Sequence, residues 1–178
     1  VGRLAPEKNL EFLTASLRAY VSANAAAHVV VAGQGPLADH MQSAFEEIGH
    51  AASLHMLGPV TGRRLADVYA SMDVFAFSSH SETQGLVLAE AMAAGVPVAA
   101  LDAYGAREVV SDARNGRLLP SDASAAHFCE ALAWVAKCPS AKRQSLQKAA
   151  RKTSQRYSRA ISTRRMLQLY EARIAMKA

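Results

Sequence analysis

The sequence predicts an α/β fold, in which a parallel sheet has helices on both faces and a helical segment follows it. Three observations support this fold class. Short apolar runs rich in valine and alanine alternate with segments of helical period up to residue 119. Glycine or polar residues follow several of these runs, and the pattern from Ser124 onward is wholly helical. Strands that alternate with helices are typical of βαβ units, whose strands are parallel and whose crossovers are right-handed.

Apolar side chains that recur every three or four residues predict the helices. Leu10, Leu13, Leu17 and Val21 follow this spacing and predict a first helix over residues 9–23. Further helices are expected at residues 36–48 and 86–94. Another is expected to begin after Thr61, which can cap it, and to include Leu65, Val68, Tyr69 and Met72. From residue 124 onward the chain is expected to be helical, with breaks near Pro139 and Tyr157.

Short apolar runs that end at turn residues predict the strands. They are expected at residues 28–32, 51–57, 73–77, 96–101 and 117–119. In parallel sheets, ligands bind at the carboxyl ends of the strands. We therefore expect one crevice where four loops converge: Gly2-Arg3, Gly33-Gln34-Gly35, Gly58-Pro59 and Ser78 to Gly85. For the glycine pair at 33 and 35, a tight turn is a sufficient explanation.

Two carboxylates frame the most informative segment of the chain. Glu82 lies in the polar loop after the third expected strand, and Glu90 lies one turn into an alanine-rich helix. Gly85 lets the backbone approach a ligand closely. The helix that begins near Leu86 leaves its first N–H groups unpaired, and these groups form an anion site together with the helix dipole. Because carboxylates accept hydrogen bonds from hydroxyls, the segment predicts a receptor for a sugar nucleotide.

Composition and cysteine usage limit the class of protein. The 178 residues fit one domain, and 51% of them are apolar. No apolar run reaches the ~18 residues that a membrane span needs, and no signal peptide is recognisable, so we expect a cytoplasmic location. Cys129 and Cys138 would be roughly 13 Å apart on one helix, beyond the reach of a disulfide, which favours free thiols. The chain begins at Val1 without an initiator methionine and is expected to be an excised piece.

Positive charge is concentrated at the C-terminal end. Residues 137–178 carry 12 of the 20 lysines and arginines but a single acid, Glu171. We expect Met166, Leu169, Tyr170 and Ile174 to pack on the domain and to leave the cations outward. Two interpretations stay open for these cations: contact with an anionic membrane surface, or simple solvation. Nucleic acid is not expected as a partner, because no aromatic residues alternate with the charges.

Three motifs carry a resemblance to a known family. They are Val1-Gly2-Arg3-Leu4 with Glu7-Lys8-Asn9, then Gly33-Gln34-Gly35-Pro36-Leu37, and then Glu82 to Val98, which contains Glu-x(7)-Glu and Glu-Ala-Met-Ala-x-Gly-x-Pro-Val. In this order the chain resembles the C-terminal, donor-binding domain of the retaining glycosyltransferases of family 4, also called group 1. The resemblance implies one Rossmann-like half of a GT-B fold over residues 1–178.

The resemblance also implies roles for individual residues. Arg3 and Lys8 match the pair that neutralises the donor diphosphate, as a guanidinium and an ammonium can do. Glu90 matches the carboxylate that binds the ribose hydroxyls, and Glu82 matches the catalytic-site carboxylate that faces the transferred sugar. It further implies that the backbone N–H groups of Gly85, Leu86 and Val87 bind the phosphates. The loop that contains Leu57 and Val60 is implied to hold the base.

The family pattern leaves several points open. Thr83-Gln84 stands where many members carry Gly-Phe, so the donor sugar is not predicted. Most of the family's first strand and its N-terminal acceptor-binding domain are expected to be missing, so the chain alone is expected to lack catalysis. No cofactor is expected, and no divalent metal either, because there is no Asp-x-Asp motif and the family does not require one. Two alternative functions are a GT-B sugar-nucleotide epimerase and a non-catalytic nucleotide- or phosphate-binding module.

Overall fold

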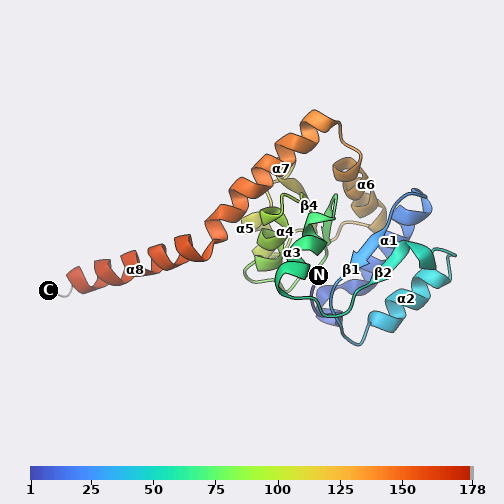
Figure 1. The fold of residues 1–178 in the computed structure, drawn as a ribbon, viewed down its shortest axis with the longest axis horizontal. Helices are drawn as coiled ribbons and strands as arrows, with labels where there is room; N and C mark the ends of the chain where they lie inside the picture. Colours follow the sequence, from blue (N-terminus) through green and yellow to red (C-terminus); the bar gives the residue numbers. More distant parts are fainter. Residues whose placement is uncertain (177–178) are drawn as a thin grey trace.

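The computed structural model describes residues 1–176 and confirms the α/β class, with parallel sheets flanked by helices (Figure 1). One sheet pairs β1 with β2, and the other has the order β3-β4-β5. Every strand pair is parallel. The strand bounds are β1 (Val29–Val31), β2 (Leu54–Met56), β3 (Phe75–Phe77), β4 (Val98–Leu101) and β5 (Gly116–Leu119).

Helices connect the strands and form the C-terminal part. Their bounds are α1 (Leu10–Ser22), α2 (Ala38–Glu46), α3 (Gly62–Ala70), α4 (Leu86–Ala93), α5 (Tyr104–Val109), α6 (Ala125–Ala136), α7 (Ser140–Ser154) and α8 (Arg159–Ala175), with 3-10 turns η1 (Pro6–Lys8), η2 (Ala51–Ser53) and η3 (Gln155–Tyr157). No described helix is both long and apolar enough to cross a membrane.

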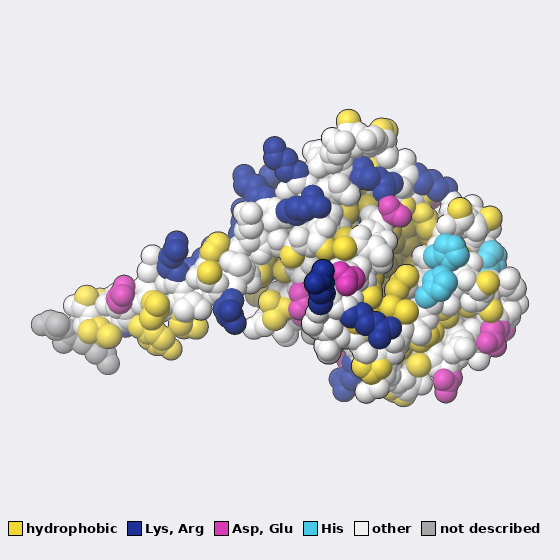
Figure 2. All heavy atoms as spheres, viewed as in Figure 1, with side chains coloured by type: hydrophobic (Ala, Val, Ile, Leu, Met, Phe, Trp, Pro, Cys, Tyr) yellow, Lys and Arg dark blue, Asp and Glu magenta, His cyan; other side chains and the backbone are white. Residues whose placement is uncertain are grey.

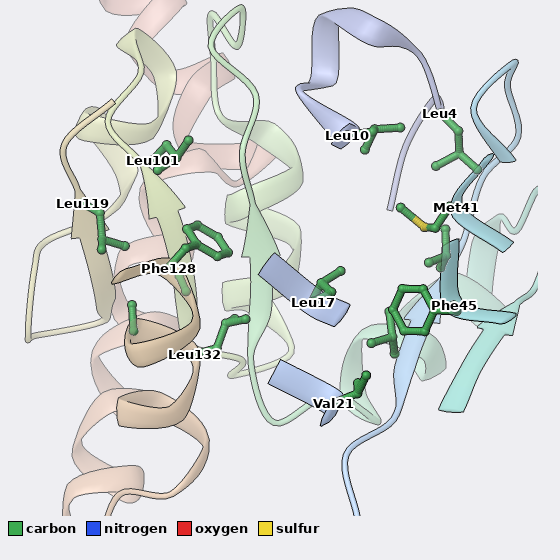
Figure 3. Close-up of a cluster of buried hydrophobic side chains, with 14 residues drawn as sticks. Leu4, Leu10, Leu17, Val21, Met41, Phe45, Leu101, Leu119, Phe128 and Leu132 are labelled. Atoms are coloured by element: carbon green, nitrogen blue, oxygen red, sulfur yellow. The ribbon is translucent and has the colours of Figure 1, made fainter. Parts of the chain in front are cut away.

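Strand β4 is buried on both faces and separates two parts of the core. Ala99 and Leu101 belong to the cluster that includes α1 and α6, whereas Val98 and Ala100 belong to the cluster that includes α4 and α7. In the first cluster, the α1 residues Leu17 and Val21 lie between Leu132 of α6 and Phe45 of α2 (Figure 3). Successive strand residues point to opposite faces, so helices cover both sides as expected.

Two elements differ from the sequence prediction. No helix was expected between residues 101 and 117, yet α5 forms at Tyr104–Val109. Six residues are too few to show a helical period, and the first turn is fixed by a distant contact: the N–H of Gly105 donates to the carbonyl of Glu82 across 2.8 Å. The expected strand at 51–57 is shorter, because Ala51–Ser53 forms a 3-10 turn.

The prediction for the last helix was wrong. No residue of α8 is buried, and its large apolar side chains after Ile161, among them Leu169 and Ile174, are more than half exposed. The helical segment is interrupted at η3, where the hydroxyl of Tyr157 donates to the carbonyl of Glu108. Helix α8 then extends away from the body of the domain (Figure 1). Its apolar atoms and cations are both on the surface, and cations also gather over α7 (Figure 2).

The N-terminal segment explains the glycines at 33 and 35. Gly2 donates its N–H to the carbonyl of Ala32, and Leu4 donates to the carbonyl of Gln34, each across 2.9 Å. A Cβ atom at Gly33 or Gly35 would collide with the carbonyl oxygen of Gly2 or Leu4. These glycines are therefore required by the close approach of two backbone segments. Both cysteines are free, as predicted.

Candidate functional site

Loops from several strands meet along one rim of the sheets. The N–H of Gly2 bonds to Ala32, just after β1, and the N–H of Gly33 bonds to the carbonyl of Gly58 across 2.8 Å. The N-terminal segment, the loop after β1 and the loop after β2 thus lie side by side. This arrangement is the convergence that the order of strands and loops predicted.

Serine hydroxyls join the turn η1 to the loop after β3. The hydroxyl of Ser78 donates to the carbonyl of Lys8 across 2.9 Å, and that of Ser79 donates to the carbonyl of Glu7 across 3.3 Å. Both serines are buried. Sequence reasoning missed this role, because the partners are about 70 residues apart. Their one signal in the sequence is a pair of hydroxyls directly after an apolar strand.

These hydrogen bonds place Lys8 next to Glu82. The Lys8 Nζ atom lies 3.6 Å from Oε2 of Glu82, whose side chain is 16% exposed. The other carboxylate oxygen, Oε1, accepts a hydrogen bond from the N–H of Gly85 at 3.0 Å. The Glu82 carboxylate therefore lies between a cation and the first turn of α4, where the helix dipole favours negative charge.

Gly85 makes the turn into α4 possible. It adopts a left-handed φ of +66°, and a Cβ atom there would lie 2.6 Å from the carbonyl oxygen of Gly105 and 2.7 Å from Cγ2 of Val109. Among the hydrogen bonds of residues 1–176, none has the N–H of Leu86 or Val87 as its donor. Because Glu82 already occupies the N–H of Gly85, the two following N–H groups are the free donors at this helix end.

Glu90 is held by Tyr69, which the sequence placed on a helix but to which it gave no role at the site. The hydroxyl of Tyr69, on α3, donates to Oε2 of Glu90 across 2.9 Å. Tyr69 is almost fully buried, whereas Glu90 is exposed. Burial, reinforced by the hydrogen bond to Glu90, raises the pKa of Tyr69 well above its usual range. The hydroxyl thus remains a donor, and it fixes one carboxylate oxygen while the other is available.

The other predicted residues lie along the same rim, apart from this centre. Arg3 is exposed and forms an ion pair with Glu7. Leu57 and Val60 are half-buried, and the N–H of Leu57 bonds to the carbonyl of Val31 at 2.8 Å. Across residues 1–176, no group of three acidic, histidine or cysteine side chains is placed to hold a metal ion.

A comparison with known protein families finds a match over most of the chain. The model of the family described as glycosyl transferases group 1 matches residues 1–153. The chain belongs to this family. It is 41% identical over 120 residues to a GDP-mannose-dependent alpha-mannosyltransferase of Mycobacterium tuberculosis, a match that covers 67% of the chain and 29% of that relative. Over 117 residues it is 33% identical to the sulfoquinovosyl transferase SQD2 of Arabidopsis thaliana, covering 66% and 21% of the two chains.

Solved structures show the same fold. This glycosyltransferase domain superposes on Anabaena Alr3699/HepE in complex with UDP with a TM-score of 0.80 and 21% identity, over 96% of the chain and 48% of that structure. It superposes on the C-terminal domain of LpcC, a group 1 family protein of Francisella tularensis, with a TM-score of 0.78 and 20% identity, over 89% and 84% of the two chains. The chain spans less than a third of the curated relatives named above, and the expected membership of the group 1 glycosyltransferases is confirmed.

Proposed function

We propose that this domain binds a nucleoside diphosphate sugar, and that the glycosyltransferase to which it belongs transfers the hexosyl group to an acceptor with retention of configuration. One observation supports this most strongly. Helix α4 presents free N–H groups in its first turn and Glu90 in its second, while Lys8 and Glu82 lie beside its N-terminus. An anion site and a hydroxyl-binding carboxylate thus share one rigid element.

The diphosphate is the part of the donor that the first turn of α4 fits. The N–H groups of Leu86 and Val87 lie at the positive end of the helix dipole, which favours phosphate. Lys8 supplies a cation at this end, and Arg3 lies along the same rim. No divalent metal is required in this proposal, because the cations and the helix N-terminus supply the positive charge.

We assign the binding of the ribose to Glu90. This residue lies four positions after Leu86, about 6 Å further along the helix axis at ~1.5 Å per residue. Tyr69 already occupies Oε2, so Oε1 is the oxygen that accepts the ribose hydroxyls. The loop with Leu57 and Val60 lies along the same rim and is our candidate for holding the base.

The transferred sugar is assigned to Glu82, the catalytic carboxylate of this proposal. In the present arrangement Glu82 occupies the N–H of Gly85 and faces Lys8. A diphosphate at the same place would compete for these partners and release the carboxylate toward the sugar. The acceptor would be held by an N-terminal domain of the same enzyme, so the 178 residues alone should bind donor but not turn it over.

Calorimetric titration with GDP, UDP and ADP, and with a sugar ester of each, tests this function. We expect the diphosphates to bind with EDTA present, and the attached sugar to change the affinity. Equal affinity for a diphosphate and its sugar ester would favour the non-catalytic module. Conversion of a sugar nucleotide to its epimer, detected by chromatography, would favour the epimerase. Failure of every nucleotide to bind would contradict the proposal.

A further inference from the structure

Two histidine side chains meet on the β1–β2 sheet, outside the site described above. Nδ1 of His28 lies 3.0 Å from Nε2 of His55, and the two ring centroids are 5.1 Å apart. Both side chains are exposed, and histidines gather on one part of the surface (Figure 2). His28 directly precedes β1, so the pair lies toward the amino end of that strand, whereas the candidate site lies at the carboxyl ends. The proposed function gives this pair no role.

The register of the two parallel strands sets this contact. Val30 of β1 is the partner of His55 in β2, and His28 lies two positions before Val30. Side chains two positions apart along an extended chain point to the same face, so the two histidines project from one face of the sheet. The hydrogen bonds between β1 and β2 therefore hold both residues in place before any ligand binds.

The distance between the two nitrogens fits a shared transition-metal ion. With metal–nitrogen distances of ~2.0–2.1 Å, two nitrogens 3.0 Å apart subtend an angle of about 94° at the ion. Neighbouring ligands in square-planar and octahedral complexes are about 90° apart, and Cu²⁺ and Ni²⁺ favour such geometries. A tetrahedral Zn²⁺ ion needs about 109°, which would require the nitrogens to separate to ~3.3 Å. The pair as it stands therefore suits Cu²⁺ or Ni²⁺ better than Zn²⁺.

The protonation of the pair is compatible with metal binding. In the neutral pair, one ring N–H donates to the nitrogen of the other ring. Coordination uses the lone pairs of both nitrogens, so this proton moves to the second nitrogen of its own ring. No proton is lost in total, and each imidazole binds in its neutral form, the usual form of a histidine ligand. Because the rings are exposed, each can turn to direct its lone pair at the ion.

We propose that His28 and His55 form a two-histidine binding site for Cu²⁺ or Ni²⁺, with water in the remaining coordination positions. Within residues 1–176, no group of three acidic, histidine or cysteine side chains is placed to hold a metal ion, so the site is open to solvent and the ion exchanges freely. The ion connects the start of β1 to β2, and because it binds the folded arrangement it stabilises the domain. The inference does not depend on the proposed function.

Calorimetric titration of the domain with CuCl₂, NiCl₂ and ZnCl₂ tests this site. Nucleotide is left out, because diphosphates chelate these ions. We expect one ion per chain, with Cu²⁺ bound most tightly and Zn²⁺ more weakly than Ni²⁺. His28→Gln and His55→Gln should each weaken binding at least about tenfold, because each leaves one ligand where two acted together. The matched control is His40→Gln/His127→Gln, which removes exposed histidines from α2 and α6 and should bind normally.

Thermal unfolding gives a second measurement on the same proteins. At an ion concentration ten times the Kd, the unfolding midpoint of the unaltered domain should rise by about 3–6 °C and return when EDTA is added. Either single variant should lose this rise, whereas the control variant should keep it.

Nuclear magnetic resonance of the unaltered domain locates the ion without any substitution. Less than one equivalent of Cu²⁺ should broaden the ring signals of His28 and His55 before those of His40 and His127. The reverse order would overturn the proposal. Absence of saturable binding by the unaltered domain would overturn it as well, and so would full affinity in either His28→Gln or His55→Gln, since the ion would then not be shared by the two rings.

Discussion

The hydroxyl of Tyr69 donates to Oε2 of Glu90 across 2.9 Å and so joins α3 to the second turn of α4. If this bond orients Glu90 for ribose, Tyr69→Phe should weaken nucleoside diphosphate binding several-fold, measured by calorimetry. A hydrogen bond to a charged group contributes roughly 1.5–3 kcal/mol, and less at an exposed carboxylate. Because the pKa of Tyr69 is raised, its phenol stays protonated and the effect should be the same at neutral and mildly alkaline pH.

Tyr20→Phe is the matched control for this variant. Tyr20 is half-buried, and among the described hydrogen bonds its hydroxyl has none. Removing that hydroxyl should leave the affinity unchanged. If both variants bind nucleoside diphosphate as tightly as the unaltered domain does, Tyr69 does not position Glu90.

The sequence predicted those parts of the fold and site that depend on local pattern. The buried strand β4 and the Gly85 turn into α4 follow from a short apolar run and from a glycine before a helix. The roles of Tyr69 and Ser78 could not be predicted, because their partners are 21 and 70 residues away. The prediction that α8 packs on the domain was wrong. Apolar residues at helical spacing indicate that a helix has apolar side chains on one side, but they do not indicate what covers them.

Glu82 should matter to the sugar and not to the diphosphate. Glu82→Gln removes the charge that pairs with Lys8 and weakens the contact with the N–H of Gly85. Both groups then become available to phosphate. We predict that the variant binds free nucleoside diphosphate at least as tightly as the unaltered domain, and that it binds the nucleotide sugar more weakly. A parallel loss of affinity for both ligands would remove Glu82 from the sugar site.

Gly85 and Gly62 form a natural pair for testing the entry into α4. Both have left-handed φ, +66° and +59°, and both lie at the start of a helix. Alanine at either position costs roughly 1–2 kcal/mol in conformation. At Gly62 the added Cβ meets open space, whereas at Gly85 it meets Gly105 and Val109. Gly85→Ala should therefore lose about 1–3 kcal/mol more unfolding free energy in denaturant titrations; equal losses would show that the crowding relaxes freely.

The exposed helix α8 predicts salt-sensitive binding to anionic membrane surfaces, which we propose as a peripheral contact of this domain. Its arginines and its exposed apolar residues are all accessible to such a surface. Co-sedimentation with anionic vesicles should weaken for the double variant Arg164→Gln/Arg165→Gln, by about 1 kcal/mol per arginine. Arg63→Gln/Arg64→Gln, an exposed pair on α3, is the matched control. Absence of binding at low salt would exclude this contact.

The claim that α4 holds the nucleotide is tested most directly by titrating Glu90→Ala with nucleoside diphosphate in a calorimeter. Charge-assisted bonds from two ribose hydroxyls contribute roughly 1.5–3 kcal/mol. We predict an affinity about 10- to 100-fold lower than that of the unaltered domain, with the same unfolding midpoint. Glu130→Ala, which removes an exposed acid from α6, should bind normally. Unchanged affinity in a well-folded Glu90→Ala domain would contradict the account.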